Sequence, residues 1–271
     1  PETQVISFGT PMGEERAGIG FNVINDKTFV EDQTAFFINF SYKLSLSDKT
    51  DLYLGIQGGG NAFRVNASRL KTYSDDLLNQ DPNLIDHSQF NPNVGVGIYL
   101  VSEKVFLSLS APKILNTKRF VEKEGFYTSA TDRVHSYISA GRHFSMSDDW
   151  TFTPYFLTRF VNGAPIFSSI NTAWKKTDQF ELGLEYNLKS SLGANMIFEF
   201  NNMGLGYAYT RSIHKEINQY SVGSHELLLR ISFGSNKNGI DDLEKIDNDR
   251  GENGVEIGTT NMKNNNISKR F

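Results

Sequence analysis

The chain has 271 residues, a net charge of −4, and a composition that is 38% hydrophobic and 13% aromatic. Its length suits one large domain or two ordinary ones, and its acidic balance argues against a nucleic-acid partner. Cysteine is absent, which excludes disulfides, thiolate nucleophiles and cysteine-ligated metals. The 23 glycines, the many aromatic residues and only 7 prolines favour a β protein.

The first residue is Pro1, and no apolar signal segment precedes it. We therefore expect a processed or truncated chain from which any targeting segment has been removed. No window approaches the run of about 18 apolar residues that a membrane helix needs. Hydropathy does not test for a membrane β-barrel, because only alternate residues of its strands face lipid.

Thirteen segments show the period-two alternation of a half-buried strand, in which successive side chains point to opposite faces. In segment 93–101, Val94, Val96 and Ile98 share one face, while Gly95 and Gly97 share the other. In chain order the predicted strands are residues 3–9, 17–25, 34–44, 52–60, 93–101, 104–111, 133–144, 150–161, 167–175, 178–188, 191–201, 203–212 and 223–233.

The connections between these strands alternate between short turns and longer links. The short turns carry PMGEE, SLSDKT, SEK, SMSDD, KKTD and NN; the longer links are residues 26–33, 61–92, 112–132, 162–166 and 213–222, with 187–191 as a modest exception. Sorting of loop length by parity predicts an antiparallel outer-membrane β-barrel, which has short periplasmic turns and longer external loops. The last strand then ends at the periplasmic rim.

Outer-membrane barrels made from one chain have an even number of strands. Segment 3–9 is expected to run from the outside towards the periplasm, so we expect a strand before it to be missing from this chain. The prediction is an all-β transmembrane antiparallel barrel with about fourteen strands in the mature protein. Its barrel domain covers residues 1–233.

After Phe233 the composition changes, because residues 234–271 are rich in Asn, Asp and Gly. Such a segment does not bury enough apolar surface to offset the entropy of ordering. We therefore predict a disordered periplasmic tail over 234–271.

Alternation assigns the strand residues to the two faces of the barrel. The last strand directs four apolar residues to lipid, and its aromatic end resembles the signal that barrel-assembly machinery recognises; these residues are Leu227, Leu229, Ile231 and Phe233. The charged residues predicted to face the lumen are Glu181, Glu185, Glu199, Glu226 and Arg230. For these charges we favour a structural salt-bridge lattice over a selectivity filter. A large soluble β-barrel or sandwich is the alternative to the membrane barrel.

The sequence offers no pattern typical of catalysis or of a cofactor. The five histidines lack metal-ligand spacing, and no G-x-S-x-G elbow occurs. The stretch GIQGGGNAF lacks the Lys-Ser/Thr of a phosphate loop, and DNDRGENG places Gly251 and Glu252 out of register for a calcium loop. We therefore expect a protein without enzymatic activity, without a metal and without a cofactor.

Several stretches resemble the PorP/SprF family. They are TQVISFGTPMGEERAGIGFNVINDK, LSLSAPKIL, LGYAYTRS and SVGSHELLLRISF, with the strongest similarity in GLGYAY and GSHELLL. The resemblance covers residues 3–233. It implies an outer-membrane protein of Bacteroidota that is associated with type IX secretion and gliding motility. It also implies that the protein docks, exports or anchors a secreted surface protein such as an adhesin, with periplasmic secretion components as further partners.

Contact with a surface partner is expected in the long external loops 61–92 and 112–132, because aromatic residues on such loops often mark interfaces. The candidate contact residues are Phe63, Tyr73, Phe90, Phe120, Phe126 and Tyr127. The alternative is that these loops pack over the barrel mouth. Two alternative functions are an outer-membrane channel or transporter for small solutes and an outer-membrane lipase or protease.

Overall fold

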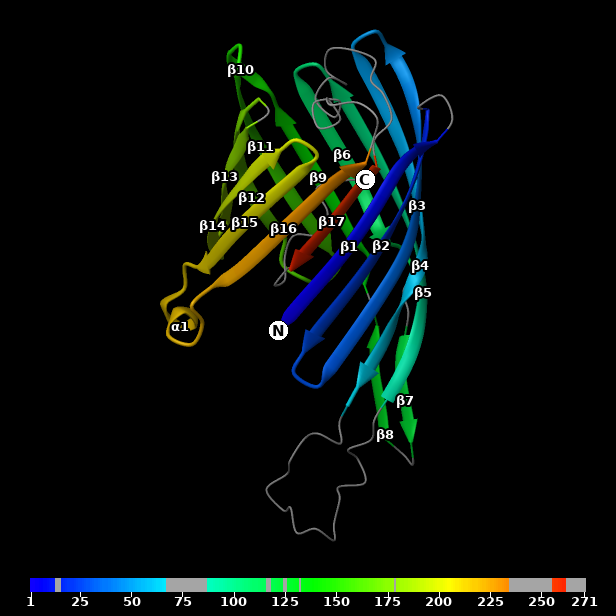
Figure 1. Cartoon of the computed structure of the whole chain (residues 1–271). Helices are drawn as coiled ribbons and strands as arrows, with labels where there is room; N and C mark the ends of the chain where they lie inside the picture. The colour runs from blue at the N-terminus through cyan, green and yellow to red at the C-terminus, as the bar shows by residue number, and fades with distance from the viewer. Residues whose placement is uncertain are drawn as a thin grey trace.

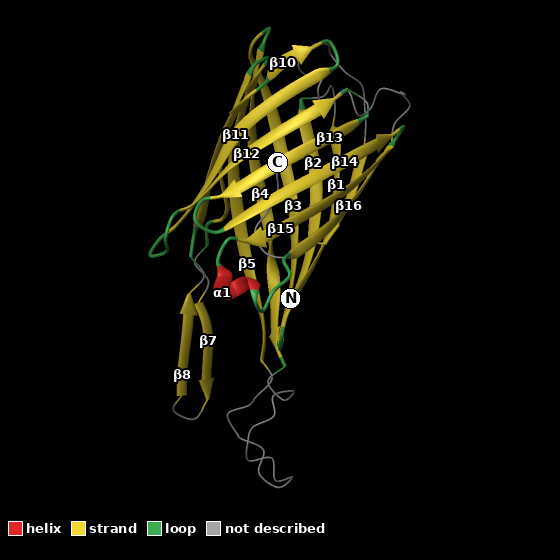
Figure 2. Ribbon diagram, turned by 90° about the vertical axis from the view of Figure 1, so that its left-hand side faces the viewer, coloured by secondary structure: helices red, strands yellow, loops and turns green. Residues whose placement is uncertain are grey.

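Nearly all strands of the computed structural model belong to one antiparallel sheet that curves around a common axis (Figures 1 and 2). The structure describes residues 1–12, 16–66, 87–115, 118–123, 126–131, 133–177, 179–233 and 255–261. Within these ranges, no helix is long and apolar enough to cross a membrane.

The large sheet contains the following segments: β1 (Glu2–Met12), β2 (Ala17–Thr28), β3 (Glu31–Ser47), β4 (Thr50–Val65), β5 (His87–Ser102), β6 (Val105–Lys113), β9 (His135–Arg142), β10 (Phe144–Ser147), β11 (Trp150–Val161), β12 (Phe167–Lys176), β13 (Phe180–Asn187), β14 (Ser191–Phe200), β15 (Met203–Ser212), β16 (Ser224–Phe233) and β17 (Val255–Asn261). A separate hairpin consists of β7 (Lys118–Lys123) and β8 (Phe126–Thr131). A single short helix, α1 (Lys215–Asn218), follows β15 within the described part of the chain.

The fifteen segments of the sheet occupy fourteen strand positions, because β9 and β10 follow one another along the same edge of β11. β9 pairs with β6 on one side and β11 on the other, and β17 pairs with both β16 and β1. Each position therefore has a paired neighbour on both sides over at least part of its length. The hydrocarbon core of a membrane requires such pairing, because no water is present there to hydrogen-bond with unpaired backbone groups.

The predicted number of strands is confirmed, but the fourteenth position is filled differently. In place of a strand before β1, the tail segment Val255–Asn261 lies between β16 and β1 (red strand in Figure 1). The prediction of disorder across 234–271 is therefore wrong for this segment. Its run of Val, Ile and Thr is the part of the tail best suited to a strand, and two strand edges are available to pair with it.

The sorting of connections by length is confirmed, with one correction. The short turns lie at one rim, and the long excursions, including α1 and the β7–β8 hairpin, lie at the other (Figure 1). The link between β2 and β3 was expected to be long, yet the ladder continues to the pair Thr28–Glu31 and leaves a two-residue turn. Phe29 has a φ of 57° in this turn. β4 and β5 also extend further than predicted, because their pairing continues as far as Val65 and His87.

The outward face of the sheet is apolar and exposed, as the alternation predicts. Ile56, Leu205 and Leu227 are 60%, 53% and 60% exposed. The neighbouring positions of the same strands point into the lumen, where glycine, serine and asparagine predominate. The outward surface of the sheet is therefore apolar, and its inward surface is mainly polar.

Candidate functional site

Near the long-loop rim a set of inward side chains is buried, and we call this set the neck. These side chains are buried although they alternate with exposed outward residues of the same strands. The neck consists of Ala35, Phe37, Asn61, Phe63, Asn91, Asn93, Ser169, Asn171, Asn187 and Ser191. All of them lie close to the ends of strands that meet the long loops. Their burial shows that neighbouring groups cover these side chains at this level.

The neck is polar, and part of its hydrogen-bonding capacity is unused. Asn61 and Asn91 are paired across β4 and β5, and Asn91 is 0% exposed. Neither amide atom of Asn91 has a hydrogen-bond partner, and the same holds for Nδ2 of Asn61 and Oδ1 of Asn187. Buried amides normally find partners, so the neck is suited to hold groups that donate and accept hydrogen bonds, such as a polypeptide backbone.

Two local features position side chains in the neck: a pair of hydrogen bonds and a glycine next to an aromatic ring. Asn93 Nδ2 donates to the Leu115 carbonyl at 3.0 Å, and the Leu115 N–H donates to Asn93 Oδ1 at 3.1 Å, which ties β5 to the segment after β6. The ring of Phe37 lies across Gly59, where a Cβ would come within 2.9 Å of Phe37 Cδ1. A glycine at this position therefore allows an aromatic ring to lie flat on the inner wall.

The half of the lumen near the short turns is lined by an arc of five rings, which we call the aromatic arc. It comprises Tyr53, Tyr99, Phe106, His143 and Tyr155. Ring centroids lie 6.1 Å apart for Tyr53–Tyr99 and 6.2 Å for Tyr99–Phe106. Phe106 also lies 5.7 Å from His143 and 6.2 Å from Tyr155, and all five residues are half-buried. Phe106 and Tyr155 approach each other over Gly141, where a Cβ would lie 2.6 Å from atoms of both. This half of the lumen is therefore partly apolar.

One pair among the predicted lumen charges forms a direct salt bridge. Arg230 Nη1 lies 3.1 Å from Glu199 Oε1, and the two side chains are 15% and 8% exposed. They belong to β16 and β14, on either side of Gly204 in β15. Burial of both partners next to a glycine makes this pair a structural clamp across three strands.

The other predicted lumen charges are distributed along the same wall. Glu181 pairs in register with Lys175, and Glu185 pairs in register with Asn171. Glu226 lies opposite Ala208. The structure therefore brings Glu199 and Arg230 together and leaves Glu181, Glu185 and Glu226 at separate register positions.

The candidate partner-contact residues have different locations. Phe63 was expected on an external loop, but it lies in β4, points inward and is 7% exposed; this prediction is wrong because β4 continues five residues beyond the predicted end. Phe90 lies in β5, faces outward and is 63% exposed. Tyr73 lies outside the described residues. The remaining candidates belong to the β7–β8 hairpin, of which the backbone is described: Phe120, Phe126 and Tyr127.

The residues of the predicted barrel-end signal lie on β16, which ends at Phe233. Leu227 and Phe233 are 60% and 50% exposed, while Leu229 and Ile231 are half-buried. β17 pairs with this strand at Leu229 and Ile231.

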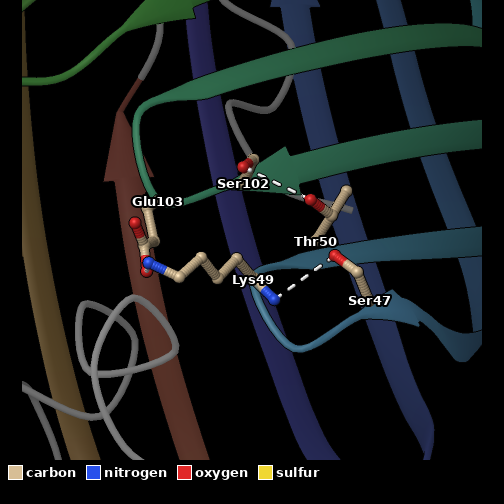
Figure 3. Close-up of polar contacts among 5 residues, drawn as sticks. All are labelled: Ser47, Lys49, Thr50, Ser102 and Glu103. Carbon is tan, nitrogen blue, oxygen red and sulfur yellow. Dashed lines mark hydrogen bonds and ion pairs between the residues drawn. The ribbon is translucent and has the colours of Figure 1, made fainter.

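Polar contacts connect neighbouring turns at the short-turn rim (Figure 3). Lys49 Nζ lies 2.8 Å from Glu103 Oε1, and Thr50 Oγ1 donates to Ser102 Oγ at 3.4 Å. The hydrogen bond to Glu103 and the charge of that carboxylate raise the pKa of Lys49 above its usual value. These contacts join the β3–β4 turn to the β5–β6 turn in water, where exposed ion pairs contribute little to stability.

Within the described residues, no group of three or more His, Asp or Glu side chains is placed to hold a metal ion. The asparagines and serines of the neck are the residues that sequence reasoning missed. Their signal in the sequence is weak, since inward polar residues alternate along every strand and only the folded structure shows which of them are buried.

A girdle of outward aromatic side chains surrounds the short-turn end of β10 to β14. Ring centroids lie 6.3 Å apart for Phe144–Phe152, 4.2 Å for Phe152–Trp174 and 6.3 Å for Phe180–Phe198. Aromatic girdles mark the level at which a barrel wall passes from hydrocarbon to headgroups. With the paired ring of strands and the apolar outward band, they define a transmembrane β-barrel of the outer-membrane class.

The family described as type IX secretion system membrane protein PorP/SprF matches residues 1–231. The chain therefore belongs to the PorP/SprF family, and it is an outer-membrane β-barrel protein of the type IX secretion system. No curated protein matches the sequence.

Three solved structures show distant similarity. A Pseudomonas aeruginosa FadL homologue is 8% identical with a TM-score of 0.46, covering 96% of this chain and 88% of that chain. The beta domain of the Bordetella autotransporter BrkA is 8% identical with a TM-score of 0.26, covering 96% and 97%. The TodX monoaromatic hydrocarbon channel mutant is 9% identical with a TM-score of 0.32, covering 96% and 88%. Scores this low carry no conclusion for the present chain.

Proposed function

We propose that this barrel docks, exports or anchors a secreted surface protein, such as an adhesin, at the outer membrane of a gliding member of the Bacteroidota. Its short-turn rim faces the periplasm and is the side on which secretion components are met. The barrel is not an enzyme and carries no cofactor; it acts through noncovalent recognition.

The neck is the observation that supports this proposal. A solute channel needs a continuous polar path, whereas the inward side chains at the long-loop rim are buried. Buried side chains at this level support a lumen that is narrow on the side from which external solutes enter, and the long-loop rim is then the better candidate for contact with a large partner. Excursions such as the β7–β8 hairpin project beyond the barrel there (Figure 2).

Replacement of residues 118–131 by a short Gly-Ser linker tests the docking role. Surface display of the secreted protein is expected to fall to background, while the variant still shows the gel shift of a folded barrel. A matched control shortens the link at residues 162–166, which lies at the same rim and holds none of the candidate contact residues. Unchanged display in the hairpin variant would mean that the hairpin is not the dock.

A channel or transporter for small solutes is the second candidate. The aromatic arc favours it, because half-buried rings on the inner wall are suited to contact a small molecule. Conductance of the reconstituted barrel separates the two functions.

A further inference from the structure

An apolar groove runs along the outward face of β12 to β15. Its volume is about 460 Å³, and its lining includes Trp174, Leu184, Ala194, Met196, Tyr207 and Tyr209. Ala194 is paired with Leu184 on one side and Tyr209 on the other, so a small side chain between two larger ones makes the hollow. In a lipid-facing wall, such a groove has the shape and chemistry to hold an acyl chain.

Cationic side chains lie directly beyond the long-loop end of this groove. The outward residues of β15 run from Leu205 through Tyr207 and Tyr209 to Arg211. This order matches the succession of hydrocarbon, interface and headgroup phosphate across a leaflet. Lys189 and Lys215 are exposed on the two adjacent loops.

Hydrogen bonds hold these two loops together. The ring Nε2 of His214 lies 2.8 Å from the Lys189 carbonyl, and the Ile213 N–H donates to the Ser190 carbonyl at 2.9 Å. Lys189 itself has a φ of 57° in the β13–β14 turn. The cations are therefore presented by a braced platform rather than by independent flexible loops.

The loop after β15 lies against the lipid face instead of over the lumen. The hydroxyl of the outward Tyr209 donates to the Val222 carbonyl at 2.5 Å. Ile217, Tyr220 and Val222 of this loop are 49%, 87% and 79% exposed. Apolar exposure of this extent next to cations is typical of a segment in the boundary between headgroups and acyl chains.

We propose that this face binds an anionic lipid, with an acyl chain in the groove and the headgroup phosphate against Arg211, Lys189 and Lys215. Glu216 is the acidic neighbour on α1, and it leaves the platform positively charged. Phosphate on a lipid is the ligand that joins both halves of the site, because it combines a negative charge with a hydrocarbon chain. The inference depends on the barrel lying in a membrane and is independent of the docking function.

Titration of the detergent-purified full chain with phosphatidylglycerol or phosphatidylcholine, followed by native mass spectrometry, tests the site. Phosphatidylglycerol is expected to be retained in preference to phosphatidylcholine. Arg211→Gln and Lys189→Gln are each expected to weaken retention about fivefold, the effect of one cation near a membrane surface. Lys27→Gln with Arg64→Gln, which removes two exposed cations from β2 and β4 near the same rim, is the matched control and is expected to change nothing.

Filling the groove tests the apolar half of the site. Ala194→Phe is expected to reduce retention of phosphatidylglycerol. If the phenylalanine side chain prevents folding, Ala194→Leu is used as the test variant instead. Excess inorganic phosphate is expected to leave the lipid in place. Wild-type retention in Arg211→Gln with Lys189→Gln, an equal loss in the control, or displacement of the lipid by phosphate alone would each overturn the proposal. Surface display by the lipid-site variants separates this outcome from failure of the docking function.

Discussion

A glycine allows the buried ion pair between Glu199 and Arg230 to form. A Cβ on Gly204 would lie 2.7 Å from Glu199 Oε2 and 3.4 Å from Arg230 Cβ, so any side chain there would intervene between the partners. We predict that Gly204→Val destabilises the barrel by about 3 kcal/mol, because a buried carboxylate loses its cation. Valine itself favours strands. Urea unfolding of the barrel in vesicles measures the loss.

The double variant Gly204→Val with Glu199→Gln distinguishes the lost pair from steric crowding. It is expected to recover most of the stability, since the uncompensated charge is gone. If it remains as unstable as Gly204→Val alone, crowding by the valine and not the ion pair accounts for the effect.

At the scale of whole elements, β17 decides whether the wall is continuous. Its register pairs Thr259 with Ile6 of β1 and with Leu229 of β16. The protein has no cysteine, so engineered pairs report on this register without background. We predict that Ile6→Cys with Thr259→Cys forms a disulfide on mild oxidation, because paired residues of adjacent strands bring their Cβ atoms within about 5.5 Å. Electrophoresis without reductant detects the cross-link.

The matched control is Val5→Cys with Thr259→Cys, one residue out of register and on the opposite face. It is expected to stay reduced. Preferential linkage of Val5 would mean that β17 pairs in another register, and linkage of neither would mean that the tail does not occupy the seam between β16 and β1.

At the scale of the whole molecule, the neck lies at the long-loop end of the lumen. Phe37 and Phe63 are the large apolar side chains of the neck, at 3% and 7% exposure. We predict that the wild-type barrel is silent in planar bilayers and that Phe37→Ala with Phe63→Ala conducts ions, because removal of two rings opens space in the neck. Single-channel recording measures both. Steady conductance of the wild-type barrel would favour the channel function.

The outward surface of the whole barrel predicts how the protein behaves in water. The outward wall exposes a band of large apolar residues far beyond the patches of an ordinary soluble protein. Without detergent the folded chain is therefore expected to aggregate, which light scattering measures. A folded monomer in plain buffer would contradict the membrane placement.

The sequence by itself determined the architecture, since a side-chain period of two and the sorting of turn lengths are local properties that survive without tertiary context. It also determined the family. The alternation placed Leu227 and Phe233 outside and Glu199 and Arg230 inside, because strand parity alone assigns a face.

Only the tertiary structure determined three features: the burial of the neck, the ion pair between Glu199 and Arg230, and the position of β17 between β16 and β1. Burial of Asn91 depends on pairing of β5 with β4 and on other groups distant in sequence. The ion pair between Glu199 and Arg230 depends on a glycine in the strand between them. Phe63 was misplaced because the end of β4 is set by pairing with β5, not by its own residues. The sequence did not predict β17, because a short β-prone run in a polar tail forms a strand only where strand edges such as those of β16 and β1 are available for pairing. These features depend on contacts between distant parts of the chain, and local pattern does not encode them.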